Sequence, residues 1–112
     1  MPEPKYTLKK SNGGKFMFNL HAGNGQIVLT GQQYASKSGA ENGIASVKTN
    51  SGKEERFERK KTSNNQHYFV LTAANKEIIG KSESYTSTGA MENGIKSVMT
   101  NGPKAAVDDQ TG

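Results

Sequence analysis

Residues 34–50 read YASKSGAENGIASVKTN, and residues 85–101 read YTSTGAMENGIKSVMTN, 51 positions further along the chain. The match extends back to residues 15–50 against residues 66–101, where 15 of 36 positions are identical without a gap. Repetition at a fixed period indicates one structural unit that is made twice and packed on itself. The repeat therefore predicts the architecture, although it does not assign a cellular role.

The recurring segment has the spacing of an amphipathic helix. Its apolar residues lie at positions i, i+4 and i+7, which are Ala40, Ile44 and Val47 in the first copy and Met91, Ile95 and Val98 in the second. Ser38 and Glu41 match a capping box at the first helix start, and Thr88 is the expected cap of the second helix. Gly43 and Gly94 recur inside the helices, where glycine costs about 1 kcal/mol relative to alanine. Their repetition predicts that the backbone there approaches the sheet or the other helix too closely for a Cβ atom. The alternative is a glycine kept for access of a ligand.

Alternating sequence ahead of each helix predicts strands. Residues 6–8 form one such run, and residues 16–22 form another, with the apolar side chains Phe16, Phe18, Leu20 and Ala22 facing the core. Asn24-Gly25 predicts a type I′ hairpin turn after that run. The expected cross-strand pairs are Ala22–Ile27, Leu20–Leu29 and His21–Val28 and, in the second copy, Ala73–Ile78 and Thr72–Ile79.

The repeat divides the chain into residues 1–53 and residues 54–112, which we expect to form one compact folded unit. Residues 55–60 follow the first helix and also open the second repeat, with Phe57 in register with Tyr6. Residues 104–107 are the predicted closing strand, and residues 108–112 are a predicted frayed tail.

Composition argues against several classes of protein. The chain has no cysteine, which removes disulfides, thiolate nucleophiles and cysteine-ligated metals. The N-terminal MPEPKYTLKK lacks the apolar run of a signal peptide or a membrane span, so we expect a cytoplasmic protein without membrane association. His21 and His67 have no acidic partner nearby in sequence, and no glycine-rich nucleotide-binding motif is complete. The sequence therefore predicts neither an enzyme nor a bound cofactor or metal.

The chain resembles the YegP-like family of bacterial proteins over nearly its whole length. The resemblance rests on the two helical segments, on GKFMFNLHAGNGQIVLTG at residues 14–31 and on EERFERKKTSNNQHYFVLTAAN at residues 54–75. It implies an α+β fold in which two tandem β-β-β-α repeats share one antiparallel sheet. The two helices would pack on one face, and the C-terminal strand of each unit would pair into the other. The resemblance also implies a monomer that is an internal pseudo-dimer, and it implies no activity.

One candidate function is a protein-interaction module that meets an unknown protein partner on the sheet face away from the helices. The predicted pleat places these residues on that face: Met17, Asn19, His21, Val28, Tyr68, Val70, Thr72 and Ile79. Clustered exposed apolar residues mark interfaces. The alternatives are that a terminus covers the face, or that its apolar residues are singly exposed, which is normal.

The second candidate function is weak binding of nucleic acid or another polyanion. Residues 1–53 carry a net charge of +5, whereas residues 54–112 are neutral. A basic half attracts polyanions, and exposed aromatic rings stack on bases. The predicted register turns Phe16, Phe18 and Phe69 inward and leaves Tyr68 as the main exposed ring. The alternative is an ordinary solvated basic surface, since no block of lysines is longer than two.

Overall fold

The computed structural model describes residues 3–111. Its strands and helices are β1 (Lys5–Lys10), β2 (Phe16–His21), β3 (Ile27–Gly31), α1 (Lys37–Asn50), β4 (Phe57–Lys61), β5 (His67–Thr72), β6 (Ile78–Lys81), α2 (Thr88–Asn101) and β7 (Ala106–Asp109). Single 3-10 turns precede β2, at Asn12–Gly14, and β4, at Glu54–Arg56. The strands β2 and β5 lie 51 residues apart, as do the two helices. The helical and strand segments thus repeat at the period of the sequence.

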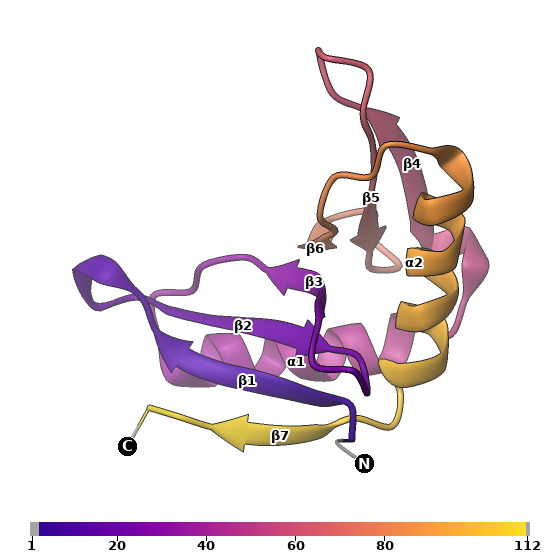
Figure 1. Ribbon diagram of the computed structural model, residues 1–112. Coiled ribbons are helices and arrows are strands. Elements are labelled where there is room, and N and C mark those ends of the chain that lie inside the picture. The colour runs from indigo at the N-terminus through magenta and orange to yellow at the C-terminus, as the bar shows by residue number, and fades with distance from the viewer. Residues whose placement is uncertain (1–2, 112) are drawn as a thin grey trace.

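All seven strands belong to one twisted sheet in the order β4-β5-β6-β3-β2-β1-β7 (Figure 1). Neighbouring strands run antiparallel, except that β7 lies parallel to β1 at one edge. The sheet is therefore mixed, and the prediction of an antiparallel sheet is corrected at β7. The fold is α+β, as the sequence predicts.

The core lies between the sheet and the two helices. It contains Ala40, Ile44 and Val47 of α1, Met91, Ile95 and Val98 of α2, and sheet residues that include Tyr6, Phe18, Leu20, Phe69 and Leu71. Helix α1 contacts β6 as well as β1 and β2, while α2 contacts β3 as well as β5. Each helix therefore packs on strands of both repeats. The Tyr6 hydroxyl adds a further link, because it donates a 2.6 Å hydrogen bond to the Gly102 carbonyl at the end of α2.

The helices begin at equivalent serines. The Ser36 side chain accepts a hydrogen bond from the Gly39 N–H at 3.0 Å, and the Ser87 side chain accepts one from the Ala90 N–H at 3.1 Å. A serine cap of this kind satisfies one of the N–H groups that have no partner within the helix. The predicted caps at Ser38 and Thr88 are therefore wrong, since both residues lie inside the first helical turn.

The hairpin turns differ from the predicted type I′ geometry. Within Asn24-Gly25, Gly25 has a positive φ of 87° and Asn24 does not, whereas a type I′ turn needs both. The second copy places Lys76 in the same conformation, with a φ of 70°. In both turns an asparagine side chain, from Asn24 or Asn75, accepts a hydrogen bond from the N–H two residues later. The asparagine repeats because this side chain stabilises the turn.

Each turn is followed by a β-bulge that changes the register. Leu20 pairs with Leu29 as predicted, but His21 pairs with Ile27, so Val28 is the extra residue. In the second copy Thr72 pairs with Ile78, and Ile79 is the extra residue. Four predicted pairs are therefore wrong, because a bulge sets two residues of one strand opposite one of its partner. They are His21–Val28 and Ala22–Ile27 in the first copy and Thr72–Ile79 and Ala73–Ile78 in the second.

The closing strand lies at Ala106–Asp109 rather than at residues 104–107. Asp108 and Asp109, predicted in a frayed tail, are thus part of β7. Asp108 pairs with Lys5 at 3.3 Å and Asp109 with Lys37 at 2.6 Å, and the Gln110 N–H donates to the Leu8 carbonyl at 2.7 Å. The predicted tail also includes Gly112, which lies outside the described residues.

Candidate interaction surface

The face of the sheet away from the helices, hereafter the outer face, is crossed by one row of paired residues. From β4 to β7 the row runs Glu58, Val70, Lys81, Thr30, Asn19, Thr7 and Asp108. Directly opposed residues on adjacent strands share a face, so these side chains lie side by side. The row is polar across β3, β2 and β1, and its apolar member, Val70, lies in β5. The outer face therefore differs in chemistry between the two repeats.

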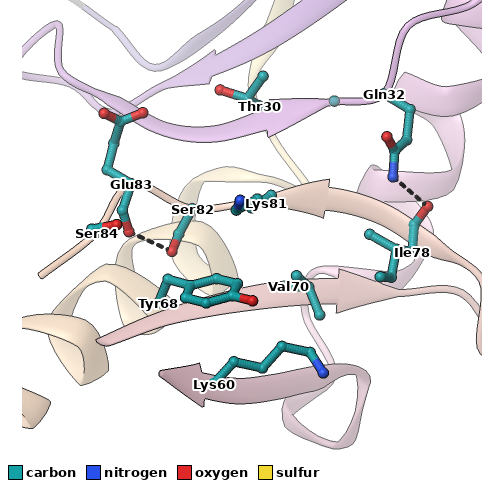
Figure 2. Close-up of a pocket in the computed structure, with 11 residues that line it drawn as sticks. Thr30, Gln32, Lys60, Tyr68, Val70, Ile78, Lys81, Ser82, Glu83 and Ser84 are labelled. Carbon is teal, nitrogen blue, oxygen red and sulfur yellow. Dashed lines mark hydrogen bonds between the residues drawn. The ribbon is translucent and has the colours of Figure 1, made fainter. Parts of the chain in front are cut away.

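A pocket of about 590 Å³ lies on the outer face of the second repeat, over β4, β5, β6 and the end of β3 (Figure 2). Tyr68, Val70 and Ile78 supply its apolar side chains. Lys60 and Lys81 supply two positive charges and Glu83 one negative charge, so the lining is positive on balance. The Lys81 ammonium lies 5.0 Å from the centroid of the Tyr68 ring, within range of a cation–π contact. Figure 2 shows Val70 between Tyr68 and Ile78 along the surface. The arrangement suits an apolar group that carries a nearby negative charge.

Ile78 was not among the residues predicted for this surface. It is 44 % exposed, and its counterpart Ile27 is 37 % exposed. Because of the bulges, Ile27 and Ile78 occupy the outer-face positions opposite His21 and Thr72. In the first copy Asn24-Gly25 also suits a longer hairpin loop whose glycine precedes a bulge, but Asn75-Lys76 carries no such signal. Simple alternation placed Ile27 and Ile78 on the core side.

Val28 and Ile79, predicted on the outer face, belong instead to the core cluster. Val70 lies on the outer face but is 2 % exposed, so it forms the floor of the pocket rather than a protruding contact. Tyr68 is partly buried at the pocket wall. Of the eight predicted residues, the structure thus brings Tyr68 and Val70 together, and Thr72 follows on the same strand.

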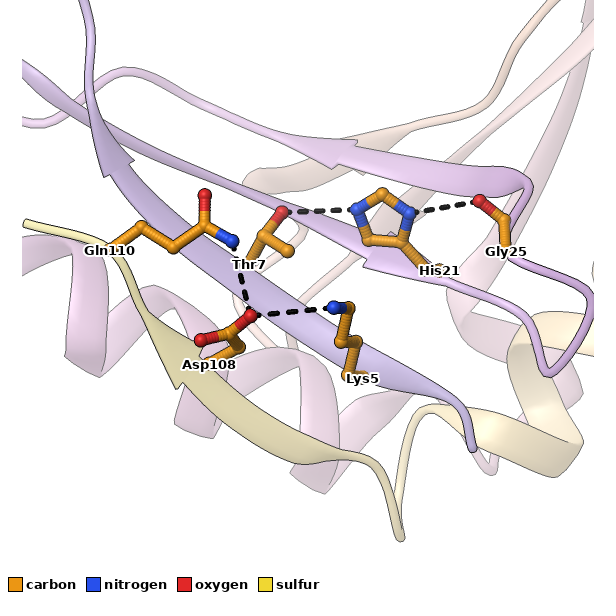
Figure 3. Close-up of polar contacts among 6 residues, drawn as sticks. All are labelled: Lys5, Thr7, His21, Gly25, Asp108 and Gln110. Carbon is orange, nitrogen blue, oxygen red and sulfur yellow. Dashed lines mark hydrogen bonds and ion pairs between the residues drawn. The ribbon is translucent and has the colours of Figure 1, made fainter. Parts of the chain in front are cut away.

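The other predicted residues, Met17, Asn19 and His21, lie on β2 in the first repeat. There His21 joins a polar network (Figure 3): its Nδ1 lies 3.1 Å from the Gly25 carbonyl and its Nε2 lies 3.0 Å from the Thr7 hydroxyl. A carbonyl only accepts, so Nδ1 carries a proton, and in the neutral ring Nε2 accepts from Thr7. Asp108, nearby, contacts Lys5 and Gln110. This network ties the hairpin turn to β1.

Two of the seven lysines in residues 1–53 are engaged by β7. Lys5 and Lys37 form ion pairs with Asp108 and Asp109. The hydrogen bond from Lys37, joined by hydrogen bonds from Thr111, holds the pKa of the Asp109 carboxyl well below its ordinary value. The second repeat therefore brings two carboxylates onto the basic first repeat. This arrangement weakens the case for a polyanion site there.

Other kinds of site find little support within residues 3–111. No three His, Asp or Glu side chains in that range gather as a metal-binding group. Over the same residues, neither helix is long and apolar enough to cross a bilayer. The open outer face of the second repeat is the feature that best suits a ligand.

The chain matches the family model described as a domain of unknown function, DUF1508, twice, over residues 7–58 and 62–109. It is 51 % identical over 106 residues to the UPF0339 protein YegP of Yersinia pestis, which covers 95 % of both chains. It is 49 % identical over 106 residues to YegP of Escherichia coli K12, covering 95 % of this chain and 96 % of that one.

Two solved structures have the same fold. A solution NMR structure of a UPF0339 protein from Shewanella oneidensis superimposes with a TM-score of 0.91 at 50 % identity, covering 97 % of this chain and 92 % of that one. The solution NMR structure of yegP from E. coli gives a TM-score of 0.92 at 47 % identity, covering 100 % and 97 %. The family membership predicted from the resemblance is thereby confirmed. The chain belongs to the DUF1508 family, and it carries two copies of the DUF1508 domain in tandem.

Proposed function

We propose that this chain is a non-enzymatic protein-interaction module of the cytoplasm, acting as a monomer, and that it docks a protein partner on the outer face of the second repeat. The observation that carries the proposal is Ile78, which is 44 % exposed beside Tyr68 and Val70. Both helices pack on the opposite face of the sheet. When a partner buries an apolar side chain that was exposed to water, the burial makes the free energy of binding more favourable.

The pocket indicates the chemistry of the partner. Tyr68 offers a ring face and Val70 an apolar floor, which suit an inserted apolar side chain. Lys60 and Lys81 also line the pocket. A carboxylate of the partner next to its inserted apolar side chain would therefore lie close to a positive charge. Rim charges of this kind direct association and partner choice more than they add affinity.

A matched pair of variants tests the proposal. Ile78→Ser removes the exposed apolar side chain at the pocket, while Ile27→Ser makes the same change at the equivalent position of the first repeat. Both residues are exposed, so both variants should keep nearly the full free energy of unfolding. Proteins captured from cell extract by the wild-type chain should also be captured by Ile27→Ser and lost with Ile78→Ser.

A photo-crosslinking residue in place of Tyr68 should join the captured protein covalently and identify it. Equal capture by Ile78→Ser and Ile27→Ser would contradict the proposal. So would retention of the chain on nucleic acid that disappears at high salt, because that behaviour marks counterion release from a polyanion.

A further inference from the structure

The two ends of the sheet are not equivalent. At one end β7 pairs with the edge of β1, whereas at the other end β4, the counterpart of β1, is the last strand of the sheet formed by residues 3–111. The reason lies in the order of the chain: α2 is followed by β7, while α1 is followed directly by β4 itself. We propose that the free edge of β4, meaning its side away from β5, binds an extended acidic segment of a partner protein as a parallel eighth strand. This site adjoins the pocket, with which it shares Lys60, but it does not depend on the function proposed above.

The backbone of β4 is oriented for such pairing. Phe69 directs its own groups toward Ser82: its N–H donates to the Ser82 Oγ at 2.9 Å, and its carbonyl accepts from the Ser82 N–H at 2.9 Å. Directly opposed residues of an antiparallel pair point their N–H and C=O groups either toward each other or both away. Arg59 lies opposite Phe69, so its N–H and C=O point to the free edge. Leu8, the counterpart of Arg59, uses its carbonyl to accept from Gln110 of the β7 segment.

The strand β7 shows what such an edge accepts. Its sequence is Ala-Val-Asp-Asp, and it pairs with β1 so that Thr7 meets Asp108 and Leu8 meets Asp109. Its two carboxylates each reach a lysine of the first repeat. An acidic strand in parallel orientation is therefore the ligand that this fold already places on the equivalent edge.

The edge of β4 carries the complementary charge. Residues 56–61 read RFERKK, with four basic side chains and one acidic. Arg59 is already paired with Glu92 of α2 at 2.8 Å and Lys60 with Glu58 at 3.7 Å, so the free positive charge comes from Arg56 and Lys61. Arg56 is the counterpart of Lys5, and its Nε is buried without a hydrogen-bond partner among the described residues. A carboxylate at the position of Asp108 would lie beside Arg56 and Lys60, although also opposite Glu58. The alternative occupant of the free edge is β4 of a second copy of the chain. This is unfavourable, because it would place two basic strands side by side.

A competing explanation is that the basic residues of β4 protect the edge of the sheet from association. Basic residues on an edge strand prevent edge-to-edge association, and natural sheets use lysine in this way. Under that explanation the edge stays empty. The two explanations differ in whether an acidic strand is accepted, and this can be measured on the intact chain.

The first probe is a peptide of the chain's own residues 103–111, PKAAVDDQT, blocked at both ends. Titrated into the full-length ¹⁵N-labelled protein, it should give saturable shifts of the Arg59 and Lys61 amides, and weaker binding at high salt. A spin label at the peptide N-terminus should broaden the start of β4 more than its end, since the pairing is parallel. The matched peptide PKAAVNNQT should bind several-fold more weakly.

Variants of the protein isolate the backbone contribution. Arg59→Pro removes both the side chain and the N–H at the free edge, whereas Arg59→Ala removes the side chain alone. Proline is tolerated in edge strands when its nitrogen faces solvent. We expect Arg59→Ala to bind with reduced affinity and Arg59→Pro to lose saturable binding. Glu58→Thr, which copies Thr7 of the first repeat, should tighten binding because it removes a like charge.

A second test uses the wild-type chain and does not depend on the folding of Arg59→Pro. In this test the peptide is methylated on the backbone nitrogen that would donate to the Arg59 carbonyl. We expect the methylated peptide not to bind. The proposal is overturned by the absence of a saturable shift at millimolar peptide, by shifts confined to the pocket around Ile78, or by equal binding of Arg59→Pro and Arg59→Ala. A solution mass that rises with concentration in the absence of peptide would also overturn it, because a second copy would then occupy the edge.

Discussion

The glycine inside each helix lies directly beneath a tyrosine hydroxyl. A Cβ atom at Gly94 would be 2.5 Å from the Tyr85 hydroxyl and 3.2 Å from the Phe69 ring, and one at Gly43 would meet the hydroxyl of Tyr34. The tyrosine cannot move away easily, since its ring stacks on a core phenylalanine at a centroid distance of 6.5 Å in the second copy. The close neighbour of each glycine is thus a side chain from the segment just before the helix.

Gly94→Ala should destabilise the protein even though alanine is the better helix former. Overpacking costs about 1–3 kcal/mol, which exceeds the gain of about 1 kcal/mol in helix propensity. Gly89→Ala in the same helix is the matched control, because a Cβ there would meet no atom within 4 Å. Denaturant midpoints should fall for Gly94→Ala and rise for Gly89→Ala. A rise in both would remove the packing argument.

Lys76 occupies a turn position that its counterpart fills with glycine. Its φ of 70° lies in the left-handed region, which costs a residue with a Cβ about 1–2 kcal/mol. Lys76→Gly should therefore raise the free energy of unfolding by up to about 1 kcal/mol, the rest being offset by the added freedom of glycine in the unfolded chain. The reciprocal change Gly25→Lys should lower it, since space around Gly25 is open and the cost is conformational. Urea unfolding of both variants measures the two effects, and changes of equal sign would contradict the explanation.

At the scale of elements, the helices and strands were predictable and the strand register was not. The spacing of Ile44 and Val47, repeated in the second copy, is enough to identify the helix. The bulge is different, because it adds one residue without changing the alternation visible in the sequence. Val28 is therefore in the core while Ile27 is exposed, the reverse of the predicted order. The candidate surface inherited this error at Val28 and Ile79 and missed Ile78.

The C-terminal end of β7 is held by the ion pair between Lys37 and Asp109, and the protonation of Asp109 can be measured by titration. The hydrogen bond from Lys37 lowers the pKa of Asp109 in the folded chain. Its contribution to the docking of β7 is therefore present above the ordinary carboxyl pKa of about 3.8 and is lost as the pH falls through the folded-state value. The side-chain ¹³C titration of Asp109 should have its midpoint well below 3.8 in the wild type. In Lys37→Met it should move up, and an unchanged midpoint would show that Lys37 is not the cause.

At the scale of the whole molecule, the repeats complete each other. The first repeat receives β7 from the second, α1 packs on β6, and α2 packs on β3. The sequence predicted this exchange in outline, but not that β7 would extend to Asp109 or lie parallel to β1. It also did not predict that β4 would keep a free edge, because the segment after α1 could be assigned either to close the first repeat or to open the second.

Separating the repeats should therefore expose apolar surface on both. A fragment of residues 1–53 lacks β7 on one side and the β6 contact of α1 on the other. We expect the fragment to be insoluble, or soluble as a dimer in which each copy replaces the missing partner. Sedimentation equilibrium gives its mass. A folded monomer would contradict the exchange.

The exchange of strands and helix contacts between the repeats predicts that they form one cooperative sheet, and native-state hydrogen exchange of the intact chain tests this most directly. The slowest amides of β2 and β5 lie in different repeats but should exchange with the same free energy of opening and the same denaturant dependence, since cooperative units open together. Two distinct opening free energies, one for each repeat, would contradict a single folded unit.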